Sequence, residues 1–325
     1  MVYIGGCLIG FMLVAYNLTQ LILIPIFGDW FGLVHPSSVK IVQLFIMLTL
    51  GTLTLPVTLK NELSSKFSTI SQMTVIVIIY MLILLFVQIF SYHKKYEYNH
   101  SPRYSLFKWN IMDLIKYYGN YAYAFNCVAS VFTMMNQLKK NNHSTHIRKI
   151  YLYTVVFLFF MFASMGVIGY AGLGNDASNF DLIIMRTPLP GSKDIPMKIG
   201  YLGIVFMNIV GFIMYVIPWK VQLYGFFKIR VTTCRNICIT LAIVYIPCII
   251  GWAYPYATKV FGIIGAYFGT LLVTTIPGIL YLKYLEKTAR KWTGKYVGIF
   301  IWCIIGTSFG LISGTTLLIG LFVKI

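Results

Sequence analysis

The chain has 325 residues, of which 58% are hydrophobic, and its formal net charge at pH 7 is +18. In a soluble protein this charge would indicate a nucleic-acid binder, which gathers its basic residues on one solvated face. Here the basic residues occur in short clusters between long apolar stretches. Membrane proteins have this pattern, because basic residues in the loops between their spans set the orientation in the membrane. The composition therefore excludes an ordinary soluble protein and disfavours a nucleic-acid partner.

Nine stretches of the chain contain no Asp, Glu, Lys or Arg and are 19 to 28 residues long. A helix needs about 20 apolar residues to cross a hydrocarbon core of roughly 30 Å, and it satisfies its own backbone there. The sequence thus predicts an all-α, polytopic integral membrane protein with a single transmembrane domain over residues 1–325. We expect nine transmembrane helices near residues 4–27, 41–59, 70–92, 118–138, 150–172, 199–218, 236–254, 260–282 and 297–323.

The first of these stretches could also be a signal peptide. It lacks a positively charged n-region and a small-residue cleavage site, so we interpret it as a retained span. The six cysteines lie within or beside spans and include no CxxC pair or Cys/His cluster. They therefore predict neither a disulfide framework nor a zinc site, and we expect no metal and no cofactor.

The loops between the spans carry an uneven basic charge. The loops after the second, fourth, sixth and eighth spans hold 15 Lys and Arg residues, against 11 in the other set, which also holds six of the eight acidic residues. Because basic residues in short loops mark the cytoplasmic side, the first set is predicted to be cytoplasmic. This places the N-terminus inside, and nine crossings place the C-terminus outside.

The middles of the predicted spans hold no ionisable side chain. All five histidines lie in loops or at a span edge. Proton pumps, intramembrane enzymes and charge-lined channels keep such groups at membrane depth, so the sequence argues against these classes. We therefore expect no catalytic residue and no enzyme. A secondary transporter remains, because it binds polar solutes with backbone groups, hydroxyls and helix ends.

The stretch 260–283 reads VFGIIGAYFGTLLVTTIPGILYLK. Small residues at three- and four-residue spacings let another helix approach closely, and Pro277 interrupts the helical ladder. A packing face with a kink would explain these residues taken alone. As a string, however, it resembles the late-span motif of the amino acid/auxin permease family, which has an FGxxGA start, a hydroxyl-rich middle, and a Pro before a Tyr-Leu-Lys end. The matching residues are Phe261, Gly262, Gly265, Ala266, Thr270, Pro277, Tyr281, Leu282 and Lys283.

Four further segments resemble this family, so the resemblance is collinear over nearly the whole chain. They are residues 55–71, 121–139, 166–174 and 211–220, which resemble the fourth-to-fifth connection and the sixth, seventh and eighth helices. Two positions depart from the family pattern. Val128-Ala129 stands where a His-Pro pair is common, which argues against pH sensing there, and Leu173 replaces a Phe.

The resemblance implies a partial five-helix inverted-repeat transporter fold. Members usually have eleven spans, and the nine here correspond to the third through eleventh. In this fold the substrate lies between the broken first and sixth helices, and the sixth corresponds to the span 118–138. Its expected substrate-binding residues are Ala124, Phe125, Asn126, Cys127, Ala129 and Ser130. An ordinary kinked packing helix is the alternative interpretation.

The resemblance further implies secondary active transport of small, neutral amino acids across a plasma, endolysosomal or vacuolar membrane. Sodium coupling is not favoured. Where sodium-dependent relatives have a Thr in the eighth helix, the matching stretch holds Ile209, Val210 and Gly211, with Asn208 the nearest oxygen-bearing side chain. The expected partners are thus an amino acid, the lipid bilayer and, under proton coupling, H⁺; facilitated transport is also open.

Two alternatives remain at this point. Some members of such families are non-transporting amino-acid sensors that signal through a soluble tail, whereas the largest loops here have only about 25 residues. The other alternative is an incompetent fragment, because the implied site needs the family's first helix. On that interpretation the 325-residue chain alone would not transport amino acids, and a version with two upstream spans would.

Overall fold

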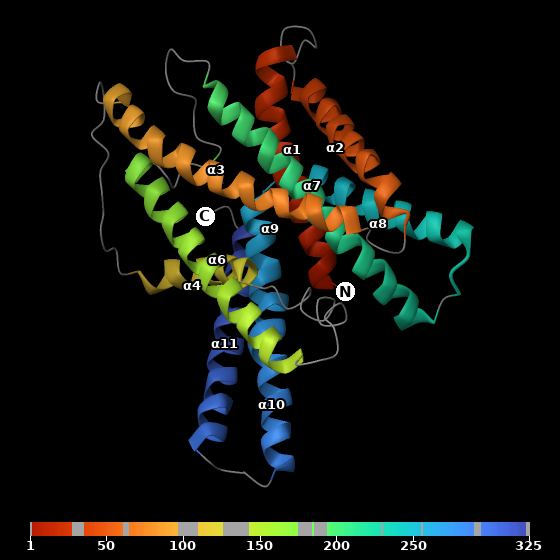
Figure 1. The fold of residues 1–325 in the computed structure, drawn as a ribbon, viewed down its shortest axis with the longest axis vertical. Helices are drawn as coiled ribbons and strands as arrows, with labels where there is room; N and C mark the ends of the chain where they lie inside the picture. The colour runs from red at the N-terminus through yellow and green to blue at the C-terminus, as the bar shows by residue number, and fades with distance from the viewer. Residues whose placement is uncertain are drawn as a thin grey trace. The chain divides into compact units, whose positions relative to one another are not determined.

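The computed structural model describes residues 2–27, 36–60, 65–96, 110–125, 143–174, 184, 194–228, 230–254, 256–288 and 294–322. Every regular element within these residues is helical (Figure 1), which confirms the all-α class. In chain order the elements are α1 (Val2–Phe27), α2 (Pro36–Thr58), α3 (Ser65–Tyr96), α4 (Ile111–Ala124), α6 (His143–Leu173), α7 (Ile195–Phe227), α8 (Thr233–Ala253), α9 (Ala257–Ile264), η3 (Gly265–Gly269), η4 (Leu271–Thr275), α10 (Ile276–Lys287) and α11 (Gly294–Phe322).

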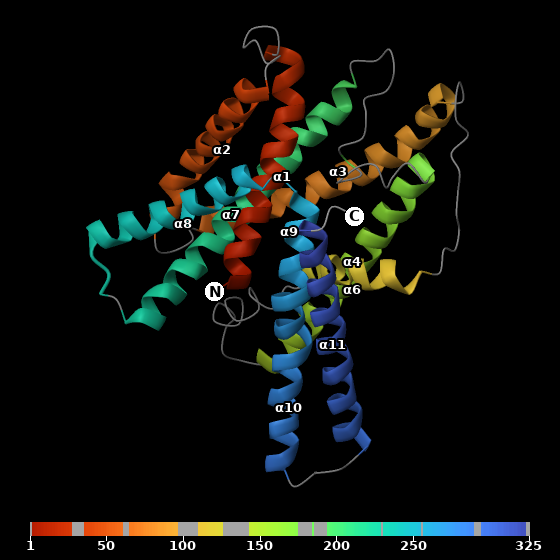
Figure 2. The same ribbon diagram turned by 180° about the vertical axis from the view of Figure 1, so that it is seen from behind.

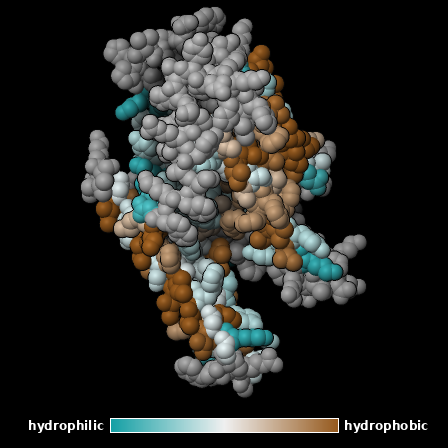
Figure 3. Space-filling view, turned by 90° about the vertical axis from the view of Figure 1, so that its left-hand side faces the viewer, coloured by the Kyte–Doolittle hydropathy of each residue, from teal (hydrophilic) through white to brown (hydrophobic). Residues whose placement is uncertain are grey.

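Seven helices in the described part of the chain are long and apolar enough to cross a membrane, counting Ala257–Lys287 as one. An eighth, α3, contains the shorter apolar stretch Gln72–Gln88. Many of the large hydrophobic side chains on these helices are exposed. Figure 3 shows hydrophobic residues over much of the coloured surface in its view. Lipid, rather than water, is the solvent that such faces require. The protein is therefore polytopic, while the count of nine spans stays a prediction.

The chain forms two compact units. The first comprises chiefly Tyr3–Phe107 and Phe159–Ala257, and the second comprises chiefly Lys108–Leu158 and Thr258–Ile325. The helix α6 contributes residues to both units. Each unit is described below by itself.

The first unit contains two antiparallel helix pairs. In one pair, Gly51 of α2 faces Cys248 of α8, and Gly251 of α8 faces Met47 of α2; a β-carbon on either glycine would lie 3.1–3.3 Å from the facing side chain. Lipid tails are as apolar as leucine, so in lipid no hydrophobic effect drives helices together. Helices associate there instead through close packing, which small residues allow. Glycine at these positions therefore sets the distance between α2 and α8.

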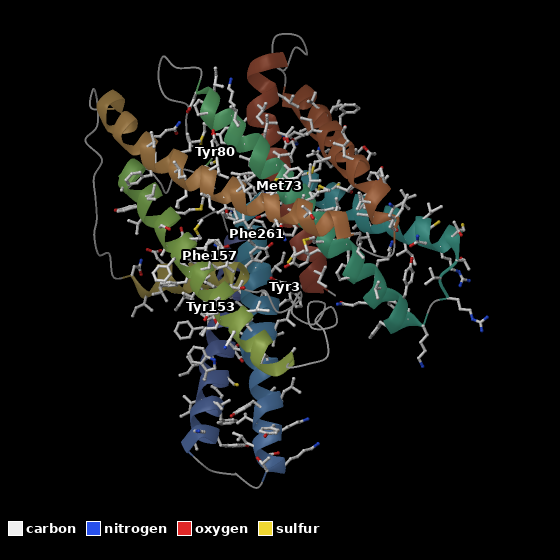
Figure 4. The ribbon with its side chains drawn as sticks, viewed as in Figure 1. Tyr3, Met73, Tyr80, Tyr153, Phe157 and Phe261 are labelled. Carbon is white, nitrogen blue, oxygen red and sulfur yellow. The ribbon has the colours of Figure 1, made fainter. Side chains whose placement is uncertain are left out.

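The helices α3 and α7 form the second antiparallel pair. A β-carbon on Gly203 of α7 would lie 2.8 Å from Val77 of α3. Near the start of α7, the Tyr80 hydroxyl (labelled in Figure 4) donates to the Pro196 carbonyl at 2.9 Å. About two turns further along α3, Gln88 Nε2 donates to the buried Asp194 carboxylate at 3.0 Å. These two bonds join α3 to the beginning of α7.

The second unit is built on an antiparallel pair formed by α10 and α11, which lie side by side in Figures 1 and 2. A β-carbon on Gly306 of α11 would lie 3.1 Å from the Thr274 hydroxyl. A β-carbon on Gly278 of α10 would overlap the Cys303 sulfur. The helix α4 packs against both η3 and α11, so the predicted substrate-binding segment begins within this unit.

Candidate functional site

The helix α4 carries the start of the predicted substrate-binding segment. It begins after Asn110, whose Oδ1 accepts from the Met112 N–H at 3.1 Å, and Asp113 lies in its first turn. Both features favour a helix start. The Asn110 side chain satisfies an N–H group that has no partner within the helix, and the Asp113 charge interacts favourably with the positive end of the helix dipole. The helix ends at Ala124, and the Phe125 N–H bonds to the Tyr121 carbonyl at 3.1 Å. The predicted span 118–138 thus contains a helix end.

The structure describes two of the six predicted substrate-binding residues. Ala124 is exposed at the last position of α4, and Phe125 is half-buried just beyond it. The other four, Asn126, Cys127, Ala129 and Ser130, lie outside the described residues. The assignment of this segment to the substrate therefore stays a prediction.

Glycines hold α4 against the stretch that carries the family motif. A β-carbon on Gly119 would overlap the Gly262 carbonyl oxygen, and one on Gly265 would overlap the Gly119 carbonyl oxygen. Close by, the Tyr123 and Phe261 rings stack with centroids 4.4 Å apart; Figure 4 labels Phe261 on α9. The prediction that small residues here allow close approach is confirmed for Gly262 and Gly265. This contact determines the position of the last turn of α4.

The family motif forms two consecutive π-helical segments, η3 and η4. π-Helical segments are rare in proteins overall, and many of those that occur lie at functional sites. Thr270 lies between the two segments, and its hydroxyl donates to the Gly265 carbonyl at 3.3 Å; the Thr274 hydroxyl of η4 donates to the Thr270 carbonyl at 2.7 Å. The sequence indicated only a weakened ladder at Pro277, which lacks an N–H group for the preceding turn. The π-helical widening of this helix was not predicted from the sequence. The hydroxyl-rich middle of the motif was the available signal for it.

Hydroxyl groups also join α11 to its neighbours. Ser313, which is fully buried, accepts from the Gly119 N–H of α4 at 3.3 Å. The Thr275 and Thr307 hydroxyls lie 2.8 Å apart, and Thr307 also donates to the Cys303 carbonyl. Because a hydroxyl has one hydrogen, Thr275 is the donor to Thr307. The packed interior of this unit thus offers hydroxyls and backbone groups for hydrogen bonding.

Replacing Thr307 by Val is expected to lower the free energy of unfolding by about 0.6 kcal/mol, the average for such interhelical bonds. The change deletes the acceptor of the Thr275 hydroxyl at almost constant volume. The matched control is Thr315→Val on the same helix, because the exposed Thr315, among the described residues, bonds only to carbonyls of its own helix. Unfolding in mixed micelles should separate the two variants; equal losses would show that the interhelical bond contributes nothing.

A second polar cluster lies in the first unit, at the end of α2. The fully buried Lys220 of α7 donates from Nζ to the carbonyls of Thr58 at 2.7 Å, Lys60 at 3.1 Å and Leu59 at 3.4 Å. The last carbonyls of a helix lack partners within it and form the negative end of its dipole. The Lys220 ammonium therefore supplies both the hydrogen bonds and the charge that this helix end requires.

Asn236 of α8 completes this cluster. Its Nδ2 donates to the Leu59 carbonyl at 2.9 Å, and its Oδ1 accepts from the Tyr224 hydroxyl at 2.9 Å. The three helices α2, α7 and α8 thus meet at one hydrogen-bonded group.

The burial of Lys220 corrects an expectation from the sequence, which counted Lys220 among the basic residues of a loop. The helix α7 continues to Phe227, and Lys220 lies inside it. The uncharged run after Lys220, from residue 221 to residue 227, was the available signal.

Asn208 is the oxygen-bearing side chain nearest the position where sodium-dependent relatives have a threonine. It is buried, and its Nδ2 donates to the Ile204 carbonyl of the same helix at 2.8 Å. The amide nitrogen is thereby engaged within α7.

These helices define a polytopic, all-helical membrane protein. The sequence pattern of the family described as "Transmembrane amino acid transporter protein" matches residues 2–320. The chain belongs to this family. It is therefore an integral, multi-pass amino-acid transporter, and its family is not one of enzymes. Neither the curated proteins nor the solved structures that were searched gave a match.

Proposed function

We propose that the protein carries out secondary active transport of small, neutral amino acids, driven by a proton gradient. The family match over residues 2–320 supports amino-acid transport. The preference for neutral substrates is supported by the second unit, where no buried side chain in the described residues is charged. A cationic or anionic substrate side chain would need a buried counter-charge, because an unpaired ion is costly at membrane depth.

The substrate-binding segment is proposed to be residues 122–130. The end of α4 at Ala124 places the negative end of a helix dipole at this segment, where it would favour a cation such as an α-ammonium group. The contact between Gly119 and Gly265 and the stacked Tyr123 and Phe261 rings hold this helix end in position. Preorganised backbone groups of this kind favour binding, because little ordering is needed when the substrate arrives.

Uptake by proteoliposomes tests the transport proposal. The protein, expressed from its complete transcript, would be assayed with radiolabelled alanine under an inward proton gradient. Saturable uptake is expected that collapses with a protonophore and that unlabelled serine inhibits, whereas lysine and glutamate do not. Uptake that requires sodium instead would contradict proton coupling, and equal inhibition by lysine would contradict the neutral preference.

The substitutions Ala129→Leu and Ser130→Leu are expected to lower alanine uptake at least tenfold. A leucine side chain at either position would fill the space that the substrate needs beside the broken helix. The control is Ala163→Leu, because Ala163 of α6 is exposed and a larger side chain there meets lipid. Uptake per molecule should be measured at equal amounts of folded protein. If both variants transported normally, the assignment of this segment to the substrate would be wrong.

A further inference from the structure

Two free cysteines, Cys234 and Cys238, are exposed at the beginning of α8. They are four residues apart, so they lie one helical turn apart on the same face. The other cysteines in the described part of the chain are buried: Cys7, Cys248 and Cys303. Exposure therefore distinguishes this pair from the cysteines that serve as small apolar packing residues.

Both thiols lie at the edge of the exposed face of α8. Leu241 and Ile249 continue the same stripe along the helix, and both are exposed. Between these two residues on the same stripe, Tyr245 lies 3.6 Å from a β-carbon at Gly51 of α2, and the neighbouring Val244 packs against the same glycine. The two thiols thus stand at the start of an apolar stripe that borders the contact with α2 and is exposed at Leu241 and Ile249.

The residues just before α8 and in its first turn have the composition of a membrane–water interface. Phe226, Phe227 and Val231 are exposed, with exposed fractions of 72%, 60% and 53%. Exposed basic residues are interleaved with them: Lys228, Arg230 and Arg235. Apolar side chains beside basic ones bind the boundary between headgroups and acyl chains, and the basic ones attract anionic lipids. The loop charges predict that this end of α8 is cytoplasmic.

We propose that Cys234 and Cys238 are sites of S-acylation by long-chain fatty acids. Juxtamembrane cysteines at the cytoplasmic surface are the residues on which this modification occurs. In the reaction the cysteine sulfur attacks the thioester carbonyl of a fatty acyl-coenzyme A. A new thioester forms on the protein, the bond to coenzyme A breaks, and the released thiol takes up the proton that the cysteine loses. The acyl chain then lies in lipid along the Leu241 stripe and anchors the start of α8.

The test is an acyl-exchange experiment on the full-length protein from cells. Free thiols are blocked with N-ethylmaleimide, thioesters are cleaved with neutral hydroxylamine, and the new thiols are tagged with a polyethylene glycol maleimide. Two hydroxylamine-dependent shifts are expected for the unsubstituted protein, one for Cys234→Ser or Cys238→Ser, and none for the double variant. The matched control Cys303→Ser should keep both shifts.

Mass spectrometry of the unsubstituted protein makes the result independent of how the variants fold. Trypsin cleavage after Arg235 separates the two cysteines into peptides 231–235 and 236–259. Each peptide should carry a hydroxylamine-labile acyl group. Free thiols at both positions, a disulfide between them, or acylation confined to Cys127 would overturn the proposal.

Discussion

The variant Lys220→Met is expected to lower the free energy of unfolding by about 2–3 kcal/mol. Hydrogen bonds to charged groups each contribute about 1.5–3 kcal/mol, and this ammonium donates to the Thr58 and Lys60 carbonyls at 2.7 and 3.1 Å. Methionine retains the length of the side chain but leaves these carbonyls without the donor and without the charge that opposes the α2 dipole. Reversible unfolding in mixed micelles measures the loss.

Two further variants separate the charge from the geometry. Lys228→Met removes an exposed lysine just beyond the end of the same helix, and its effect should stay within about 0.5 kcal/mol, as for most surface changes. Lys220→Arg keeps the charge but places a planar fork where a compact ammonium fits, so an intermediate loss is expected. Equal stabilities of Lys220→Met and Lys228→Met would show that the buried ammonium contributes nothing.

Chemical rescue can show that the missing group is a cation. Lys220→Ala removes the atoms of a propylammonium ion, so added propylammonium should restore part of the lost stability. Propanol has nearly the same shape but no charge, and it should not. Equal restoration by both additives would mean that filling the space, and not the charge at the α2 carbonyls, is what matters.

Replacing Gly119 by Ala is expected to lower the stability of the second unit by about 3 kcal/mol, at the upper end of overpacking effects. The new β-carbon would overlap the Gly262 carbonyl oxygen and lie 2.9 Å from the Ala266 side chain. Backbone cannot move aside as a flexible side chain can, so α4 would separate from η3. The bond from the Gly119 N–H to Ser313 would lengthen as well.

Gly298→Ala is the matched control, because nothing lies within 4 Å of a β-carbon at Gly298 of α11. Alanine there should be neutral or slightly stabilising, since it is the better helix former. A third variant, Gly310→Ala on the same helix, places a β-carbon 2.6 Å from the Ala266 carbonyl oxygen and should be destabilising. If Gly119→Ala and Gly298→Ala unfolded alike, the close approach of α4 to η3 would be disproved.

The sequence by itself determined the fold class, the membrane location and the family. Stretches of 19 to 28 residues without a charge leave few alternatives, because a backbone in lipid must satisfy its own hydrogen bonds. The motif at 260–283 also identified Gly262 and Gly265 as packing positions before any partner was known. For the site, the sequence placed a break in the span 118–138, and the structure ends α4 at Ala124. Four of the six predicted substrate residues lie outside the described part and stay predictions.

Only the tertiary structure decided which groups meet. A lysine looks like a loop residue by its type alone, and Lys220 is buried because the end of α2 supplies three carbonyls for it. The π-helical widening depends on how Thr270 and Thr274 bond within a helix that α4 and α11 hold in place. The exposure of Cys234, likewise, follows from which face of α8 packs on α2. The burial of Lys220 arises from contacts between residues 160 or more positions apart in the chain, which local pattern does not encode.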